Sequence, residues 1–165
     1  TYAKDCSLET PGLPQCFLEP WHPDIKVEFD SKPTQLAPDQ VEVDLRVTVT
    51  CRRKPAEDKN ANAAEQPQTP AGEGEEGPVI YICEVHQAGI FLIRNFPQEA
   101  IEYLIAGVAP NLLFPYAREH VSSLINRASF PPLNLHPYNF EAMLRARKAE
   151  EAAKRQAAGN AAATK

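Results

Sequence analysis

Several features that would mark a membrane protein or a metalloprotein are missing from this sequence. Its longest apolar runs, such as residues 90–93 and 112–114, fall far short of the roughly 20 residues that a membrane-spanning helix needs. Its four cysteines, at positions 6, 16, 51 and 83, form no C-x-x-C pair, so the usual spacing of a zinc or iron–sulfur site is absent. We therefore expect no metal and no cofactor. Without a secretory signal at the visible start, we expect a reducing cytosol and no insertion into a membrane.

Sequence motifs of catalysis are missing as well. The chain contains no phosphate-binding G-x-x-x-x-G-K-[ST] or G-x-G-x-x-G, no G-x-S-x-G and no H-E-x-x-H. Cys83 lies close to His86 in the sequence, but their odd separation along a strand would place the two side chains on opposite faces. We therefore predict that the protein is not an enzyme.

Positive charge is scarce in the body of the chain. The whole sequence has 17 Lys and Arg against 22 Asp and Glu, a net charge of −5. Residues 141–165 hold six basic and three acidic residues, a net of +3, so residues 1–140 carry −5 − 3 = −8. A body this acidic repels a phosphate backbone, so nucleic-acid binding is not expected, whereas a basic protein partner would suit it.

Alternation of apolar and polar residues predicts four antiparallel strands. The alternation is clearest over residues 41–51 and is repeated over 24–30, 79–87 and, more weakly, 2–9. Each strand would bury one face and leave the other in water. Because the helical patterns all follow the strands, the predicted fold class is α+β, a four-stranded antiparallel sheet with helices packed on one face.

Residues 52–78 interrupt this pattern. They contain no Val, Ile, Leu, Met, Phe, Trp, Tyr or Cys, and such a segment cannot bury enough surface to offset the entropy of ordering it. We predict a long disordered hairpin insert within a domain that spans residues 1–144. The insert is either a tolerated insertion or a functional loop.

Helical patterns begin after Asn95. Pro97 predicts a helix start, and Gly107 and Pro110 are expected to end that helix. A second, longer helix is expected over residues 115–128.

Further along, Asn139 is expected to cap a last helix. Residues 145–165 are predicted to be a fraying helix and a flexible C-terminal tail, since their apolar residues are all alanines.

Two features of the pattern predict an oligomer. The apolar positions Ala117, Val121 and Leu124 of the second helix have the spacing of a helix–helix contact. The first strand, residues 2–9, is a candidate edge strand that could pair with another chain.

Large aromatic residues gather in irregular segments of the chain. The connection between the first two strands is rich in proline and carries Phe17 and Trp21, and other rings flank the helix ends, namely Tyr116, Phe130, Tyr138 and Phe140. Such rings either close the end of a core or wall an apolar groove that binds extended peptide. For Phe130 we favour the core; for the others both interpretations stay open.

Several segments of the sequence resemble the SecB family of bacterial protein-export chaperones. The resemblance is carried by CEVHQAGIF at 83–91, NLLFPYARE at 111–119, FPPLNL at 130–135, PYNF at 137–140 and LRVTVT at 45–50. It covers about residues 2–51 and 79–144. The sequence departs from the family in the 52–78 insert, in its basic, alanine-rich tail and at Ala88, where a glycine is common.

The resemblance implies a homotetramer, a dimer of dimers in which helices lie between two eight-stranded sheets. Cys83, Val85 and Gln87 match family positions that face the helix layer and influence assembly. With Ala117, Val121 and Leu124, they form the expected oligomer interface.

The resemblance also implies a function and its surfaces. The protein would be a holdase that binds unfolded presecretory proteins, keeps them export-competent and delivers them to the SecA motor. The peptide-binding groove would be lined by Phe17, Trp21, Tyr81, Tyr116 and Phe140, and the surface that docks SecA would comprise Asp5, Glu9, Ile82 and Glu84. The alternatives are a SecB-like chaperone dedicated to a toxin–antitoxin system, and a small-ligand-binding protein that uses the same groove.

Overall fold

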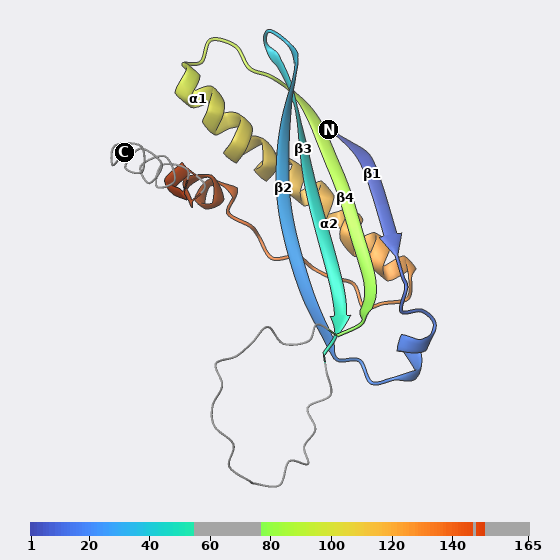
Figure 1. Ribbon diagram of the computed structural model, residues 1–165. Coiled ribbons are helices and arrows are strands. Elements are labelled where there is room, and N and C mark those ends of the chain that lie inside the picture. Colours follow the sequence, from blue (N-terminus) through green and yellow to red (C-terminus); the bar gives the residue numbers. More distant parts are fainter. Residues whose placement is uncertain (55–76, 147, 151–165) are drawn as a thin grey trace, which may run out of the picture.

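A twisted antiparallel sheet with one long helical segment across one face forms the body of the protein (Figure 1). The computed structural model describes residues 1–54, 77–146 and 148–150. Within these residues, no helix is long and apolar enough to cross a membrane. The predicted α+β class is confirmed.

The sheet contains four strands, β1 (Tyr2–Glu9), β2 (Pro23–Ala37), β3 (Gln40–Arg53) and β4 (Val79–Leu92), in the order β1-β4-β3-β2. All four predicted strands are confirmed, and three of them are longer than the alternation indicated. Strand β2 continues through Pro33, which has no backbone N–H to donate. Because β2 lies at an edge of the sheet, it pairs with β3 alone among the described strands, and no second strand there requires a donor from Pro33.

Alternate residues of the two central strands build the core. Val43, Leu45, Val47 and Val49 of β3 are completely buried, as is Val85 of β4. Their neighbours in sequence point to the opposite face, which carries most of the charged residues of the sheet. The period-2 pattern therefore identified the buried face correctly, because successive side chains of a strand must point in opposite directions.

The helical segment is continuous, which corrects the predicted break. α1 (Gln98–Tyr103) leads through a single π-helical turn, η2 (Leu104–Val108), into α2 (Ala109–Arg127). In η2 the Ala109 N–H bonds to the Leu104 carbonyl, five residues back, so the backbone is wider just where Pro110 follows. The wider turn accommodates Pro110 without ending the helix, and Pro115 lies inside α2 rather than at its start.

After α2, residues 129–139 run back beside the helix and lead into a helix that begins at residue 140 (Figure 1). The Asn139 side chain accepts a hydrogen bond from the Ala142 N–H at 2.9 Å, so the predicted cap is confirmed. Residues 148–150 are also helical. The rest of the predicted tail, residues 151–165, lies outside the described residues.

The two ends of the predicted insert meet where β3 ends and β4 begins. The Arg53 N–H donates to the Pro78 carbonyl at 3.0 Å, which extends the hairpin pairing beyond the start of β4. Of the predicted insert, residues 52–78, Arg52 and Arg53 belong to β3, and residues 55–76 lie outside the described residues.

Candidate functional site

The connection between β1 and β2, residues 10–22, crosses the end of the sheet beside the start of β4. The Gly12 N–H donates to the Ile80 carbonyl at 3.1 Å, and the Cys16 N–H donates to the Gly12 carbonyl at 3.0 Å. A Cβ at position 12 would lie 2.8 Å from the Ile80 Cα, so only glycine permits this approach. These contacts hold the short 3₁₀ helix Gln15–Leu18, which carries Phe17, against the sheet.

Four aromatic rings gather beneath and on this connection, and we call them the crossover cluster: Phe17, Trp21, Tyr81 and Phe130. The Phe130 ring lies at their centre, 5.3 Å from Phe17, 5.5 Å from Trp21 and 4.9 Å from Tyr81. Phe130 is only 2% exposed and Tyr81 only 1%, whereas Phe17 is 50% exposed and Trp21 38%. The cluster thus has a closed floor and an open upper layer. The burial of Phe130 confirms its expected place in the core.

A second group of rings lies further along β2. Phe29 lies 4.3 Å from Tyr138 and 5.8 Å from both Phe114 and Phe140. Phe140 has no exposed surface, while Tyr138 stays 36% exposed. The sequence did not single out Phe29, because its place in an alternating strand indicated an ordinary core residue.

Tyr116 lies apart from both groups. The buried stripe of α2 contains Leu113, Ala117 and Val121, and Phe114 lies on the flank of that stripe that reaches β2. At 100° per residue, Tyr116 falls on the opposite flank, towards β1. The five predicted groove residues therefore do not form one continuous lining within a chain. Tyr81 and Phe140 lie beneath other rings, Phe17 and Trp21 are open to water, and Tyr116 is elsewhere.

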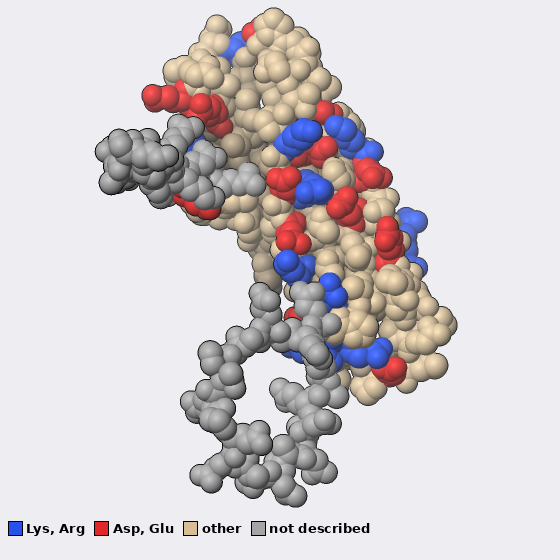
Figure 2. Space-filling model, in the orientation of Figure 1, with Lys and Arg blue, Asp and Glu red and all other residues tan. Residues whose placement is uncertain are grey.

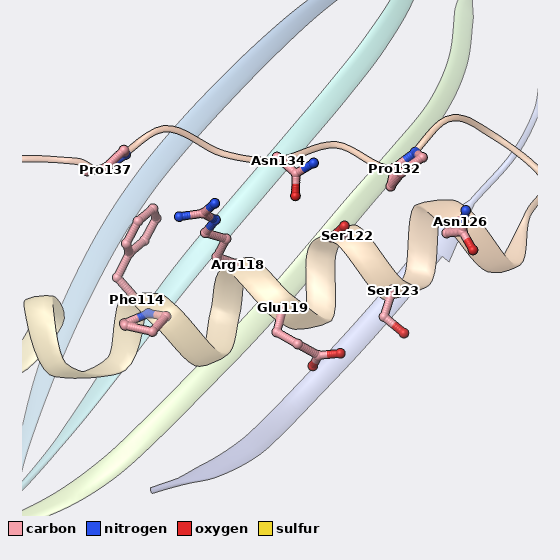
Figure 3. A pocket seen from close by; sticks show the side chains of 10 residues that line it. Phe114, Arg118, Glu119, Ser122, Ser123, Asn126, Pro132, Asn134 and Pro137 are labelled. Carbon is pink, nitrogen blue, oxygen red and sulfur yellow. The ribbon is translucent and has the colours of Figure 1, made fainter.

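A groove of about 720 Å³ separates α2 from the returning segment (Figure 3). Arg118 and Ser122 of α2 face this segment, whereas Glu119 points away from it. None of the five predicted groove residues lines it; its walls comprise Phe114, Pro115, Arg118, Glu119, Ser122, Ser123, Asn126, Pro132, Asn134 and Pro137. Its mixed polar lining distinguishes it from the crossover cluster.

The face of the sheet that points away from α2 is charged. Acidic and basic residues are interspersed over the strands rather than separated into patches (Figure 2). The four predicted docking residues all lie on this face at the β1–β4 side, where Glu9 is opposite Ile82 and Asp5 is opposite His86. The structure thus brings Asp5, Glu9, Ile82 and Glu84 together on one surface.

Polar contacts fix the side chains of this charged face. Lys4 Nζ lies 2.9 Å from Glu42 Oε2 and 3.4 Å from Asp44 Oδ2, and the Tyr2 hydroxyl donates a hydrogen bond to Glu42. The Tyr2 and Lys4 hydrogen bonds hold the pKa of Glu42 below its ordinary value. These contacts tie the start of β1 to β3, across the intervening β4.

Glu84 is held from two sides. Its Oε2 accepts a hydrogen bond from the Thr48 hydroxyl at 3.0 Å, and its Oε1 lies 3.2 Å from His86 Nε2. Partial burial raises the pKa of Glu84, but the hydrogen bonds from His86 and Thr48 outweigh it and leave the pKa below its ordinary value. Glu84 is therefore ionised near neutral pH.

The predicted oligomer interface lies mostly inside the chain. Cys83, Val85, Ala117 and Val121 have no exposed surface, Gln87 is 2% exposed, and Leu124 is half-buried against the core. The burial of Cys83 raises its pKa to about 12. The first five cannot touch a second chain directly, because the sheet and α2 of their own chain already cover them. Cys83, Val85 and Gln87 thus lie on the face of the sheet that α2 covers, and an influence of these five residues on assembly, which stays a prediction, would act through the position of α2.

Comparison with known proteins is consistent with this architecture. The family model for the preprotein translocase subunit SecB matches residues 1–151. The protein-export protein SecB of Chromobacterium violaceum is 43% identical over 160 residues, covering 97% of this chain and 89% of that protein.

Among solved structures, the SecB-like chaperone of Mycobacterium tuberculosis, in complex with a ChAD peptide from an antitoxin, has a TM-score of 0.58 and 14% identity. The match covers 84% of this chain and 86% of that one, and at this identity it supports the fold alone. The family match and the curated relative decide the assignment: this chain belongs to the SecB family of protein-export chaperones.

Proposed function

We propose that the protein is a holdase that binds unfolded presecretory chains at the crossover cluster and delivers them to SecA. The observation that carries this proposal is the two-layer arrangement of the cluster. Phe17 and Trp21 stay open to water although they rest on the buried ring of Phe130. Exposed rings on a fixed backbone offer apolar surface to a client without losing much conformational entropy on binding.

The mechanism needs no nucleotide and no covalent step. An unfolded client exposes apolar side chains that its folded form hides, and these can cover the open faces of Phe17 and Trp21. Proteins that fold quickly escape capture, so selection is kinetic. Four chains around one long client would raise the effective concentration of binding sites, and hence the avidity.

Replacing Phe17 or Trp21 by alanine tests the client site. A client that covers the 38% of the Trp21 side chain now exposed would bury about 90 Å², worth about 2 kcal/mol or about 30-fold in affinity. We expect Trp21→Ala and Phe17→Ala to weaken the suppression of client aggregation, measured by light scattering. Leu92→Ala is the matched control, since Leu92 is an exposed apolar residue at the opposite end of β4. Equal suppression by all three variants, with native assembly intact, would refute this site.

We further propose that SecA docks on the charged face at Asp5, Glu9, Ile82 and Glu84. Three acids around one apolar side chain suit a basic segment, such as the C-terminal segment of SecA in this family. We expect Asp5→Lys and Glu84→Lys to weaken SecA binding by about tenfold or more each, measured by calorimetry. Glu28→Lys is the control, because Glu28 lies on the same face but on β2, at the far edge. An affinity unchanged by the first two variants would contradict this surface.

The proposed assembly is a homotetramer, a dimer of dimers. Strand β1 lies at an edge of the sheet, so one row of its backbone groups is available to a second copy. Leu112 and Tyr116, both half exposed on the β1 flank of α2, would be covered in the same contact. Native mass spectrometry should find four chains per particle. The proposed compartment is the cytoplasm, whose reducing conditions suit the unpaired cysteines.

A further inference from the structure

The His86 ring lies between two carboxylates on the charged face. Its Nδ1 is 3.2 Å from Asp44 Oδ1, and its Nε2 is 3.2 Å from Glu84 Oε1. A neutral imidazole donates through only one of its nitrogens, whereas the imidazolium donates through both. Both contacts can therefore be hydrogen bonds at the same time only when the ring carries a proton.

We propose that His86 is a positioning residue of the docking surface, and that its proton controls how strongly a basic partner binds there. Protonated, the ring holds Glu84 and adds a positive charge beside it. When the ring is neutral, no positive charge offsets the negative charge of Glu84, which keeps its hydrogen bond from the Thr48 hydroxyl. This inference rests on the proposed docking of SecA and adds a mechanism for controlling it.

Charged groups from each neighbouring strand face the ring. Asp5 of β1 and Arg46 of β3 lie opposite His86 in the sheet register. Lys4 of β1 shares Asp44 with the ring, so Asp44 is divided between two cationic partners. The carboxylates of Asp5, Asp44 and Glu84 favour the proton, while Lys4 and Arg46 oppose it. Because charges of both signs surround the ring, a further cation that arrives beside it can change whether His86 carries a proton.

A docked Lys or Arg is such a cation. It would compete with the imidazolium for Glu84 and would repel the positive ring, so docking and protonation of His86 oppose each other. By linkage, docking then expels up to about one proton per chain, and affinity rises with pH where histidine titrates. Removing one positive charge about 6 Å from the incoming cation strengthens binding by about threefold at the dielectric of bulk water and by about 100-fold at the effective dielectric typical of a protein surface.

Calorimetric titration of the whole assembly with SecA, at about pH 6 and about pH 8, tests the inference over the range in which histidine changes charge. We expect SecA to bind more tightly at the higher pH, by between about threefold and about 100-fold. The observed binding enthalpy should vary with the ionisation enthalpy of the buffer, because the protons released on docking are taken up by the buffer. His86→Gln keeps a donor for Glu84 but cannot be protonated, so its affinity should be nearly independent of pH. His86→Lys keeps a positive charge and should bind weakly at both values.

His120→Gln is the matched control, because His120 also lies beside a carboxylate, at 3.3 Å from Glu119, but on α2. It should retain the pH dependence of the unaltered protein. If His86→Gln retains it as well, or if the unaltered protein shows none, the role of His86 is refuted while the docking proposal stands. If SecA fails to bind at either pH, the docking proposal is refuted and this inference with it.

Discussion

Phe130 gives the sharpest test of how the crossover cluster is built. The ring is 2% exposed and lies within 5.5 Å of three other ring centres, so Phe130→Ala leaves a cavity on the underside of the residue 10–22 connection. Loss of a buried phenylalanine costs about 3–5 kcal/mol, of which each lost ring contact contributes about 0.5–1.5 kcal/mol. We expect a loss of about 4 kcal/mol in the free energy of unfolding.

Urea unfolding at a fixed protein concentration measures this loss, since the stability of an oligomer depends on concentration. Phe96→Ala is the control. That ring is 52% exposed, so its removal should cost only about 1–1.5 kcal/mol. A loss below about 2 kcal/mol for Phe130→Ala, or one no larger than that of Phe96→Ala, would refute the central place of Phe130.

The same variant also links the packing to the proposed function. Without its floor, the connection should open locally, and amide exchange at Cys16 should accelerate while that of Val47 stays slow. Client capture should fall although Phe130 itself is buried from the client. Unaltered exchange at Cys16 would show that the Gly12–Ile80 contact alone holds the connection.

Further predictions concern the cysteines and the crossover glycine. At pH 8, iodoacetamide should modify the exposed Cys6 but spare Cys51 and Cys83, because burial raises the pKa of Cys51 to about 11 and that of Cys83 to about 12. Denaturation should make all three cysteines reactive. Labelling of Cys83 in the native protein would contradict its burial. For the same reason, the free energy of unfolding should fall as the pH rises from about 9, where the thiols ionise in the unfolded chain, towards the higher pKa values of Cys51 and Cys83 in the folded protein. Cys83→Ser should reduce this loss. A free energy of unfolding that stays constant at alkaline pH would contradict the prediction. Gly12→Ala places a Cβ 2.8 Å from the Ile80 Cα, so it should lower the free energy of unfolding by about 1–3 kcal/mol and weaken client capture. A variant of unchanged thermal stability would show that the connection can move aside.

Sequence alone determined the sheet and its two faces. Side-chain direction in a strand follows from local geometry, so the alternation from Val41 to Cys51 is enough to identify the buried face of that strand. The odd separation of Cys83 and His86 likewise places them on opposite faces. The docking residues share a surface for the same reason. The Asn139 cap could also be predicted, because a cap is formed within one turn of its own residue.

Only the tertiary structure decided which rings are open. Phe17 and Phe130 are far apart in the sequence, and exposure depends on what other segments cover rather than on the residue type. The sequence therefore does not reveal that Tyr81 and Phe140 lie beneath other rings, or that Tyr116 falls on the other flank of α2. The helix continues past Pro110 because one wider turn precedes it, which composition does not reveal. Local patterns fix which way a side chain points, whereas its accessibility depends on contacts that form only when distant segments pack together.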